Sequence, residues 1–126
     1  MTIADTDVLI DFLSASDPGA GVVRVEIQND NLATTVITRF ELLSGARSGR
    51  AIRAIHELLG SMRTFELDCN AADRAAAVRQ SLERKGSAIG MGDSLIAGIV
   101  LSASGVLLTR NRRHFERIDG LKLASL

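Results

Sequence analysis

Short apolar runs alternate with longer amphipathic stretches along the 126 residues of this chain. The short runs have the length of buried or half-exposed strands and occupy residues 2–5, 32–35, 63–67, 106–109 and 121–123. Apolar residues recur at helical spacing over residues 7–13, 21–28, 36–46, 49–59, 71–85, 93–104 and 111–117. The stretch 21–28 is rich in valine and isoleucine, so a strand there is the alternative.

Strands that alternate with helices predict a parallel sheet with helices on both faces. We therefore expect an α/β fold, a three-layer α/β/α sandwich with a mainly parallel sheet of about five strands, built as a single domain over residues 1–126. Thr35 and Asn70 are the expected N-caps of the helices that follow them, and Gly105 is expected to end the helix over 93–104.

The composition narrows the class of function. Hydrophobic residues make up 46% of the chain, but the aromatic residues are four phenylalanines with no tryptophan or tyrosine. A face of stacked aromatic rings, as in many single-strand RNA-binding domains, is therefore disfavoured. Fifteen basic and fifteen acidic side chains cancel, whereas a protein that coats DNA normally carries a basic excess.

Cysteine content and hydropathy bear on the compartment. Cys69 is the only cysteine, so no internal disulfide is possible, which fits a reducing environment. The N-terminus lacks the pattern of a signal peptide, and no apolar run reaches the length of a membrane span. We expect a cytoplasmic protein with no membrane partner.

Three acidic residues fall where the predicted fold brings chain segments together. Asp5 ends the first strand, Glu41 lies in the helix after the second strand, and Asp93 opens the helix that leads to the fourth strand. Right-handed crossovers place all three at the carboxyl edge of the sheet, where open α/β folds bind their ligands. Thr109 and Asn111 lie at the end of the fourth strand and are expected at the same edge.

Carboxylates that converge repel one another, and a divalent cation relieves the repulsion. Mg²⁺ and Mn²⁺ prefer oxygen ligands, and such a centre can activate water and neutralise a phosphate. His56 and His114 are too few and too far apart in the sequence for a zinc site. The pattern therefore indicates phosphodiester chemistry with Mg²⁺ or Mn²⁺.

Each acid also has a simpler explanation when it is considered alone. Asp5 can cap the first helix, and Asp7 can be a first-turn acid favoured by the helix dipole or a residue that supports the site. Glu41 and Asp93 can be ordinary helix residues, and Asn111 can be a cap. Asp11 and Asp17 are expected at the surface. The gathering of several such residues at one edge favours the functional interpretation.

Four segments together resemble PIN-domain nucleases over nearly the whole chain. Asp-Thr-Asp-Val-Leu-Ile at 5–10 resembles the opening block of that family, and 35–45 resembles the second block, with one Glu before Leu and then a Gly. Residues 89–97, with Asp before Leu-Ile-Ala, resemble the third block, and 108–115 resemble the fourth. At this length the chain is most similar to the VapC-type toxins of type II toxin–antitoxin systems.

This resemblance implies an endoribonuclease that depends on Mg²⁺ or Mn²⁺. Carried over by position, Asp5, Glu41 and Asp93 are the catalytic acids and the metal ligands. Asn111 stands at a further ligand position that is often acidic in the family, and it cannot carry a negative charge. His114 stands where many relatives have an Asp, so the number of metal ions is open.

The resemblance also implies partners, namely RNA, a VapB-like antitoxin that lays a peptide across the acidic pocket, and a second copy in a homodimer. The residues expected to contact RNA lie beside the predicted edge and are Thr6, Thr109, Arg110, Arg112 and Arg113. A solvated helix face is the alternative for the arginines.

Two rival functions share an acidic edge. A small phosphatase that forms an aspartyl-phosphate would use the Asp-x-Asp opening, but Leu9 departs from its pattern and a late pair of acids is missing. A phospho-receiver signalling domain would need an Asp after the third strand, near Asp68, and a Lys after the fifth, whereas Lys122 lies inside the last predicted strand.

Overall fold

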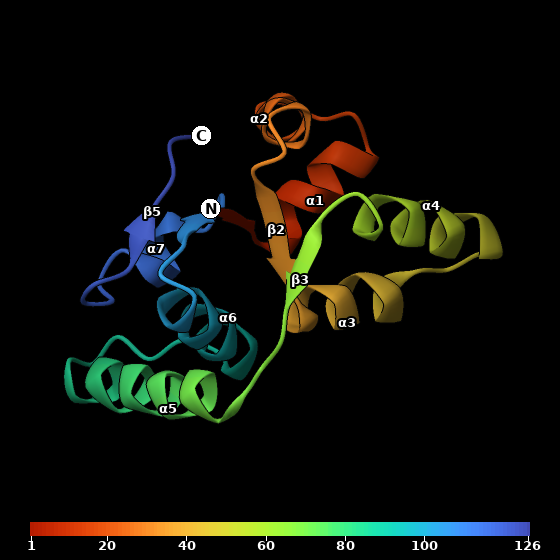
Figure 1. The fold of residues 1–126 in the computed structure, drawn as a ribbon. Coiled ribbons are helices and arrows are strands. Elements are labelled where there is room, and N and C mark those ends of the chain that lie inside the picture. Colours follow the sequence, from red (N-terminus) through yellow and green to blue (C-terminus); the bar gives the residue numbers. More distant parts are fainter.

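The structure is a computed structural model that describes residues 1–126, and it contains a five-stranded parallel sheet with helices on both faces (Figure 1). The strands are β1 (Thr2–Ala4), β2 (Leu32–Thr35), β3 (Arg63–Phe65), β4 (Val106–Leu108) and β5 (Lys122–Leu123). Their order in the sheet is β3-β2-β1-β4-β5, and every neighbouring pair is parallel. The predicted three-layer fold is therefore confirmed, and the strand order reverses between β1 and β4.

Two hydrophobic clusters hold the layers together, one on each face of the sheet. The first face is covered by α1 (Thr6–Leu13), α2 (Gly19–Gln28), α3 (Val36–Gly45) and α4 (Gly49–Leu59). The other face is covered by α5 (Cys69–Arg84), α6 (Met91–Ser102) and the short α7 (Arg112–Phe115). The valine-rich stretch is helix α2, because Ala20 and Val23 are buried on one side while Val25 remains exposed.

The helix ends follow the sequence only in part. Helix α6 ends at Ser102, its C-cap is Ala103 and the left-handed residue is Ser104 (φ 53°), so the prediction that Gly105 ends this helix was wrong. The Thr38 N–H donates to the Thr35 hydroxyl at 3.1 Å, so the predicted cap of α3 is confirmed. Asp68, and not Asn70, caps α5, because its carboxylate accepts the Ala71 N–H at 2.8 Å. The amide of Asn70 instead donates to the Ser102 hydroxyl, so the prediction for this residue was wrong.

The two long helices on the second face touch at a glycine. A Cβ added to Gly98 in α6 would lie 2.6 Å from the Cβ of Ala75 in α5, which is too close for any side chain. This contact lets α6 pack closely against α5. Helix α6 starts at Met91, two residues earlier than predicted, so Asp93 lies inside the first turn.

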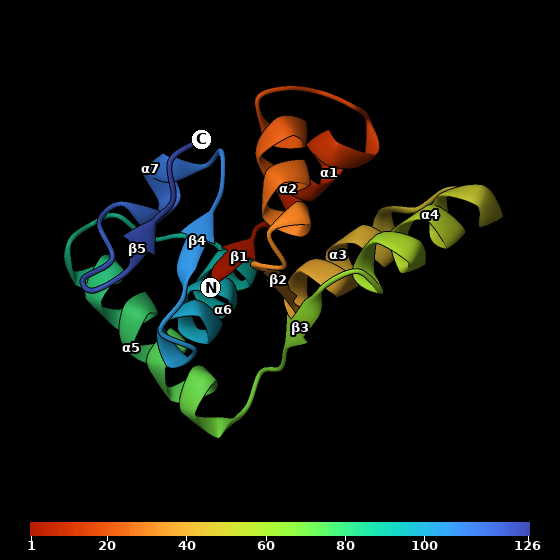
Figure 2. The same ribbon diagram turned by 45° about the horizontal axis from the view of Figure 1, so that its top comes forward.

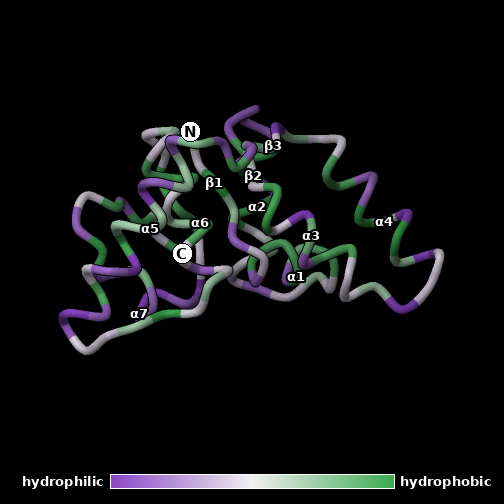
Figure 3. The backbone as a smooth tube through the Cα atoms, turned by 90° about the horizontal axis from the view of Figure 1, so that it is seen from below, coloured by the Kyte–Doolittle hydropathy of each residue, from purple (hydrophilic) through white to green (hydrophobic).

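Helices α3 and α4 lie side by side and extend away from the edge of the sheet (Figure 1 and Figure 2). Along α4 the hydropathy alternates, with Ile55, Leu58 and Leu59 buried and Arg50 and Arg53 exposed (Figure 3). None of the helices combines the length and the apolar content that crossing a membrane requires.

Candidate functional site

Asp5 lies between β1 and α1, and it is buried. Its side chain is 4% exposed, and its own N–H donates to the Leu108 carbonyl of the neighbouring strand β4 at 2.9 Å. One carboxylate oxygen accepts the Thr6 N–H at 2.7 Å, as an N-cap does, and the other accepts the Thr109 hydroxyl at 2.7 Å. Asp5 therefore both caps α1 and contacts Thr109 at the end of β4, as the sequence predicted.

The environment of Asp5 disfavours its charged form. Burial raises the pKa of its carboxyl from 3.8 to about 6, and the charges of Asp7 and Asp93 act in the same direction. The hydrogen bonds from Thr109 and Thr6 lower the pKa and offset part of this effect. A cation bound at this point would stabilise the ionised carboxylate of Asp5 and reduce its repulsion with the neighbouring acids.

Asp7 supports the loop that follows β4. One of its carboxylate oxygens, Oδ2, accepts the Arg110 N–H at 2.9 Å and lies 3.3 Å from the Thr109 hydroxyl. Because a hydroxyl carries one proton, the shorter contact with Asp5 is the stronger bond. The other oxygen of Asp7, Oδ1, is buried without a hydrogen-bond partner, which is an uncommon state for a buried polar atom.

Arg110 and Asp11 form an ion pair, with 2.8 Å between the Arg110 Nε and the Asp11 Oδ2. The prediction that Asp11 lies at the surface was wrong, because its residue exposure is 8%. Asp17 is exposed as predicted, and its carboxylate accepts the Gly21 N–H. Asp11 is buried because it follows Asp7 by one helical turn on the face of α1 that meets the loop after β4.

Glu41 is on the exposed side of α3 and reaches toward α1 and α6. Its Oε1 accepts the Thr6 hydroxyl at 2.6 Å, and that hydroxyl also lies 3.1 Å from the Thr38 hydroxyl. A Cβ added to Gly92 would lie 3.5 Å from the Glu41 Oε2, so this carboxylate is beside the first turn of α6. Glu41 therefore lies next to the residue that precedes Asp93.

Asp93 is paired with a residue that follows β4. The Nδ1 of His114 lies 2.7 Å from the Asp93 Oδ2, and both side chains retain access to solvent. The Asn111 N–H donates to the Thr109 hydroxyl at 3.0 Å, but its side chain makes no cap bond to α7. Asn111 therefore occupies the N-cap position of α7, as the alternative explanation expects, but its side chain makes no capping bond.

The remaining arginines have contacts of different kinds. Arg112 donates to the Ala124 carbonyl at 2.9 Å, and Arg117 donates to the Ser87 hydroxyl. Arg113 is exposed, as is Arg112. Both residues of α7 are therefore accessible to a large ligand beside the acidic edge.

The three acids approach the same edge but do not form a preassembled cage. No group of three histidine, cysteine, aspartate or glutamate side chains is arranged to hold a metal ion. Each acid has its own partner, because Asp5 binds Thr109, Glu41 binds Thr6 and Asp93 contacts His114. The donor set still fits a hard divalent cation, since carboxylate oxygens are its preferred ligands and the Asp7 Oδ1 is unpaired.

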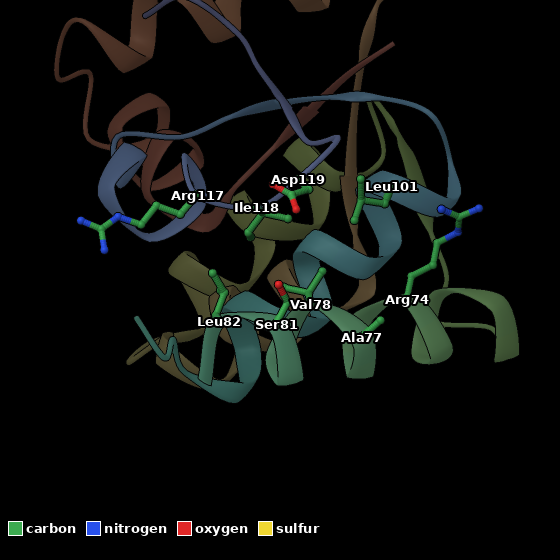
Figure 4. A pocket seen from close by; sticks show the side chains of 9 residues that line it. All are labelled: Arg74, Ala77, Val78, Ser81, Leu82, Leu101, Arg117, Ile118 and Asp119. Atoms are coloured by element: carbon green, nitrogen blue, oxygen red, sulfur yellow. The ribbon is translucent and has the colours of Figure 1, made fainter. Parts of the chain in front are cut away.

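A separate cavity of about 230 Å³ lies between α5 and the segment after α7 (Figure 4). Val78, Leu82, Leu101 and Ile118 give it an apolar lining, and none of the predicted site residues borders it. This cavity is therefore separate from the acidic edge.

The rival phospho-receiver needs a lysine beside Asp5, and the structure does not provide one. Lys122 is exposed and pairs in register with Val106, the first residue of β4, so it lies at the amino end of the sheet. Asp68 caps α5. The acids whose charges act on Asp5 come from α1 and α6 instead, namely Asp7 and Asp93.

Comparison with known proteins gives the family. The family model of the PIN domain matches residues 2–121. The chain belongs to the PIN-domain family. Among curated relatives of this PIN domain, Ribonuclease VapC1 of Haemophilus influenzae is 32% identical over 127 residues, which cover 94% of this chain and 92% of that protein. The tRNA(fMet)-specific endonuclease VapC of Shigella flexneri is 28% identical over 94% of this chain and 92% of its own length.

Solved structures show the same PIN fold. The DNA-bound VapBC complex from Salmonella typhimurium contains a chain with a TM-score of 0.85 and 26% identity, covering 98% of this chain and 96% of that one. A chain of VapBC-1 from nontypeable Haemophilus influenzae has a TM-score of 0.84 and 25% identity, with the same coverage. The predicted resemblance to VapC-type PIN domains is therefore confirmed.

Sequence reasoning missed two pairs in this PIN domain. The Asp11–Arg110 pair was missed because each residue, considered alone, has the character of a surface residue. The available signal was the spacing of Asp7 and Asp11, one turn apart on α1, opposite an arginine directly after Thr109. The Asp93–His114 contact had no signal in the sequence, because it depends on how α6 and α7 pack.

Proposed function

We propose that this PIN domain is a metal-dependent endoribonuclease and acts as the toxin of a toxin–antitoxin pair. The observation that carries the proposal is Asp5, a carboxylate whose burial and acidic neighbours raise its pKa to about 6 at the crevice between β1 and β4. Perturbed carboxylates at a strand-order reversal are typical of catalytic sites. The VapC relatives, which are named as ribonucleases, support the same activity.

We assign the catalytic role to Asp5, Glu41 and Asp93. These three carboxylates, together with the Asn111 side chain, are the proposed ligands of Mg²⁺ or Mn²⁺. When bound, the ion neutralises phosphate charge and activates water for attack on phosphorus. Thr109 holds Asp5 in one orientation through its 2.7 Å hydrogen bond, and Thr6 does the same for Glu41.

In the proposed reaction a water molecule attacks the phosphodiester in line. Its oxygen forms a bond to phosphorus, the bond from phosphorus to the leaving ribose oxygen breaks, and that oxygen takes a proton from solvent water. The Oε2 of Glu41 accepts no hydrogen bond from the protein, whereas Oε1 is occupied by Thr6, so Oε2 is the atom assigned to take the proton of the water. Positioning and charge neutralisation supply most of the rate in this class of reaction.

RNA is the proposed substrate, and transfer RNA is the first one to test because two of the relatives carry that specificity in their names. Arg112 and Arg113 are exposed on α7 beside the acidic edge, and they are assigned to RNA phosphates. Thr6 and Thr109 border the same edge and are assigned to contact the substrate while they orient the two acids.

The proposed protein partners are a VapB-like antitoxin and a second copy of this chain. A groove of about 350 Å³ between α1, α3 and α4 begins at Glu41 and is otherwise lined mainly by apolar side chains, among them Ile10, Leu13, Leu42 and Ile55. An apolar peptide in this groove would cover Glu41 and block the site. The structural relatives named VapBC support such a partner.

The test is cleavage of purified transfer RNA by the protein with EDTA, Mg²⁺ or Mn²⁺, beside the Asp93→Asn variant. We expect cleavage that requires the metal and is lost in the variant, since Asn keeps the size of Asp but not its charge. Circular dichroism checks that the variant is folded. Cleavage that is unaffected by EDTA, or that persists in the folded variant, would contradict the assignment.

A further inference from the structure

Arg110 is attached to helix α1 at two points. Its backbone N–H donates to the Asp7 Oδ2 at 2.9 Å, and its side-chain Nε lies 2.8 Å from the Asp11 Oδ2. The side chain of Arg110 is 46% exposed, whereas that of Asp11 is 11% exposed, so the arginine covers a carboxylate that is nearly removed from water. A charge buried this far requires a partner.

The space around Asp11 is shaped for this pair. Gly19, the first residue of α2, lies against the side chain of Asp11 in α1. A Cβ added to Gly19 would lie 2.7 Å from the Cβ of Asp11 and closer still to its carboxylate. Any side chain at position 19 would therefore displace Asp11. The conformation of Asp11, and with it the position of Arg110, depends on this glycine.

The pair fixes the loop that carries the hydroxyl of the site. Arg110 lies between Thr109, whose hydroxyl binds Asp5, and Asn111, whose N–H returns to that hydroxyl. Holding Arg110 on α1 therefore sets where Thr109 points and where the chain continues into α7. The guanidinium is directed to Asp11, so part of its charge is already neutralised before RNA arrives.

We propose that Arg110 and Asp11 are positioning residues of the nuclease reaction, which fix the loop after β4 against α1, and that Arg110 is not a phosphate-binding residue. This rests on the proposed function. It replaces the expectation from the sequence that Arg110, like its neighbours Arg112 and Arg113, holds RNA. The two roles differ in which kinetic constant each arginine controls.

The experiment compares Arg110→Gln with Arg113→Gln in metal-dependent cleavage of transfer RNA. For Arg110→Gln we expect kcat to fall by about ten- to a hundredfold with KM and the salt dependence of RNA binding unchanged, because a misplaced catalytic group slows the reaction without weakening binding. For Arg113→Gln we expect KM to rise and the salt dependence to become shallower by about one phosphate contact, with kcat retained.

Asp11→Asn separates the two roles further. If Arg110 positions the loop, this variant loses kcat as Arg110→Gln does, and the double variant is no worse than either single one because the pair acts as a unit. If Arg110 binds phosphate, removing the charge of Asp11 frees the guanidinium, and RNA binding becomes tighter. A rise in KM in Arg110→Gln, or tighter RNA binding in Asp11→Asn, would overturn the proposal.

Two controls keep these outcomes interpretable. Thermal unfolding shows whether Asp11→Asn is folded, and Arg110→Gln, at a half-exposed position, provides the test if it is not. Wild-type protein that fails to cleave RNA with any metal refutes the proposed function itself. Wild-type cleavage combined with a binding defect in Arg110→Gln refutes only the positioning role.

Discussion

The two halves of the acidic edge are built in opposite ways. On the β1–β4 side, Asp5 is buried and held by two hydrogen bonds, and Asp7, Thr109 and Arg110 join it to the loop after β4. On the α3–α6 side, Glu41 is exposed and each acid has a single side-chain contact. The first half is preorganised at a cost in stability, and the second half is free to adjust when a ligand binds.

Asp5→Asn tests the β1–β4 side of the acidic edge and is expected to have the largest effect on cleavage. Cleavage should fall by about a hundred- to a thousandfold, the range found when one group that stabilises transition-state charge is lost. The free energy of unfolding, measured by urea titration without metal at about pH 7–8, should rise by about 2 kcal/mol, because Asn removes the buried charge. Asp73→Asn, at an exposed site on α5, is the control and should change neither quantity.

The sign of this effect follows from the pKa of Asp5. Its value of about 6 in the folded protein exceeds the ordinary 3.8, so the folded state binds the extra proton between these limits. The contribution of Asp5 to wild-type stability is complete below about pH 4 and is lost as the pH rises through about 6. An Asp5→Asn variant that is no more stable than wild type in EDTA at neutral pH would contradict the conclusion that burial of the Asp5 charge lowers stability.

Glu41→Gln tests the adjustable half. Cleavage should again fall by about a hundredfold or more, because a proposed ligand and proton acceptor is removed. The free energy of unfolding without metal should stay within about 0.5 kcal/mol of wild type, since the side chain is exposed. Glu57→Gln on α4, also exposed, is the matched control for both measurements. If Glu41→Gln lowered the free energy of unfolding as much as a substitution at a buried position does, the α3–α6 side would not be the adjustable side of the edge.

The pH dependence of metal affinity sharpens the comparison further. Because Asp5 must be ionised to hold a cation, the association constant for Mn²⁺ should fall by about tenfold for each pH unit below the pKa of about 6. Titration calorimetry between acidic and neutral pH measures this directly. An association constant that is flat down to the ordinary range of a carboxyl would show that Asp5 is not a ligand.

Thr109→Val removes no proposed metal ligand, so its effect on cleavage should be the smallest of these changes. Valine keeps the shape but removes the proton donated to Asp5, which should cost about 1–3 kcal/mol of stability at neutral pH. Because that bond favours the charged form, its loss should also move the midpoint of Mn²⁺ binding to higher pH. Thr34→Val removes an equally buried hydroxyl that donates to the Ala4 carbonyl, so it should cost stability without moving the midpoint.

Residue spacing alone predicts most of the elements, the α/β class and the three acids that approach one edge. Strand and helix periods differ, so apolar spacing separated them even where valines made 21–28 ambiguous, and right-handed crossovers placed Asp5, Glu41 and Asp93 on one side. Errors arose at Asn70 and Asp11, where two polar residues compete for one role or a surface residue acquires a distant partner.

Which polar groups meet depends on how the elements pack in the folded chain. The burial of Asp5, and thus its raised pKa, depends on the packing of β1 against β4 and α1. The Asp11–Arg110 pair joins residues 99 positions apart (110 − 11), so the spacing of Asp7 and Asp11 identifies a partner only once the loop after β4 is known to lie against α1. Periodicity reports which face of an element is apolar, whereas the partner of a polar side chain depends on distances that only the folded chain sets.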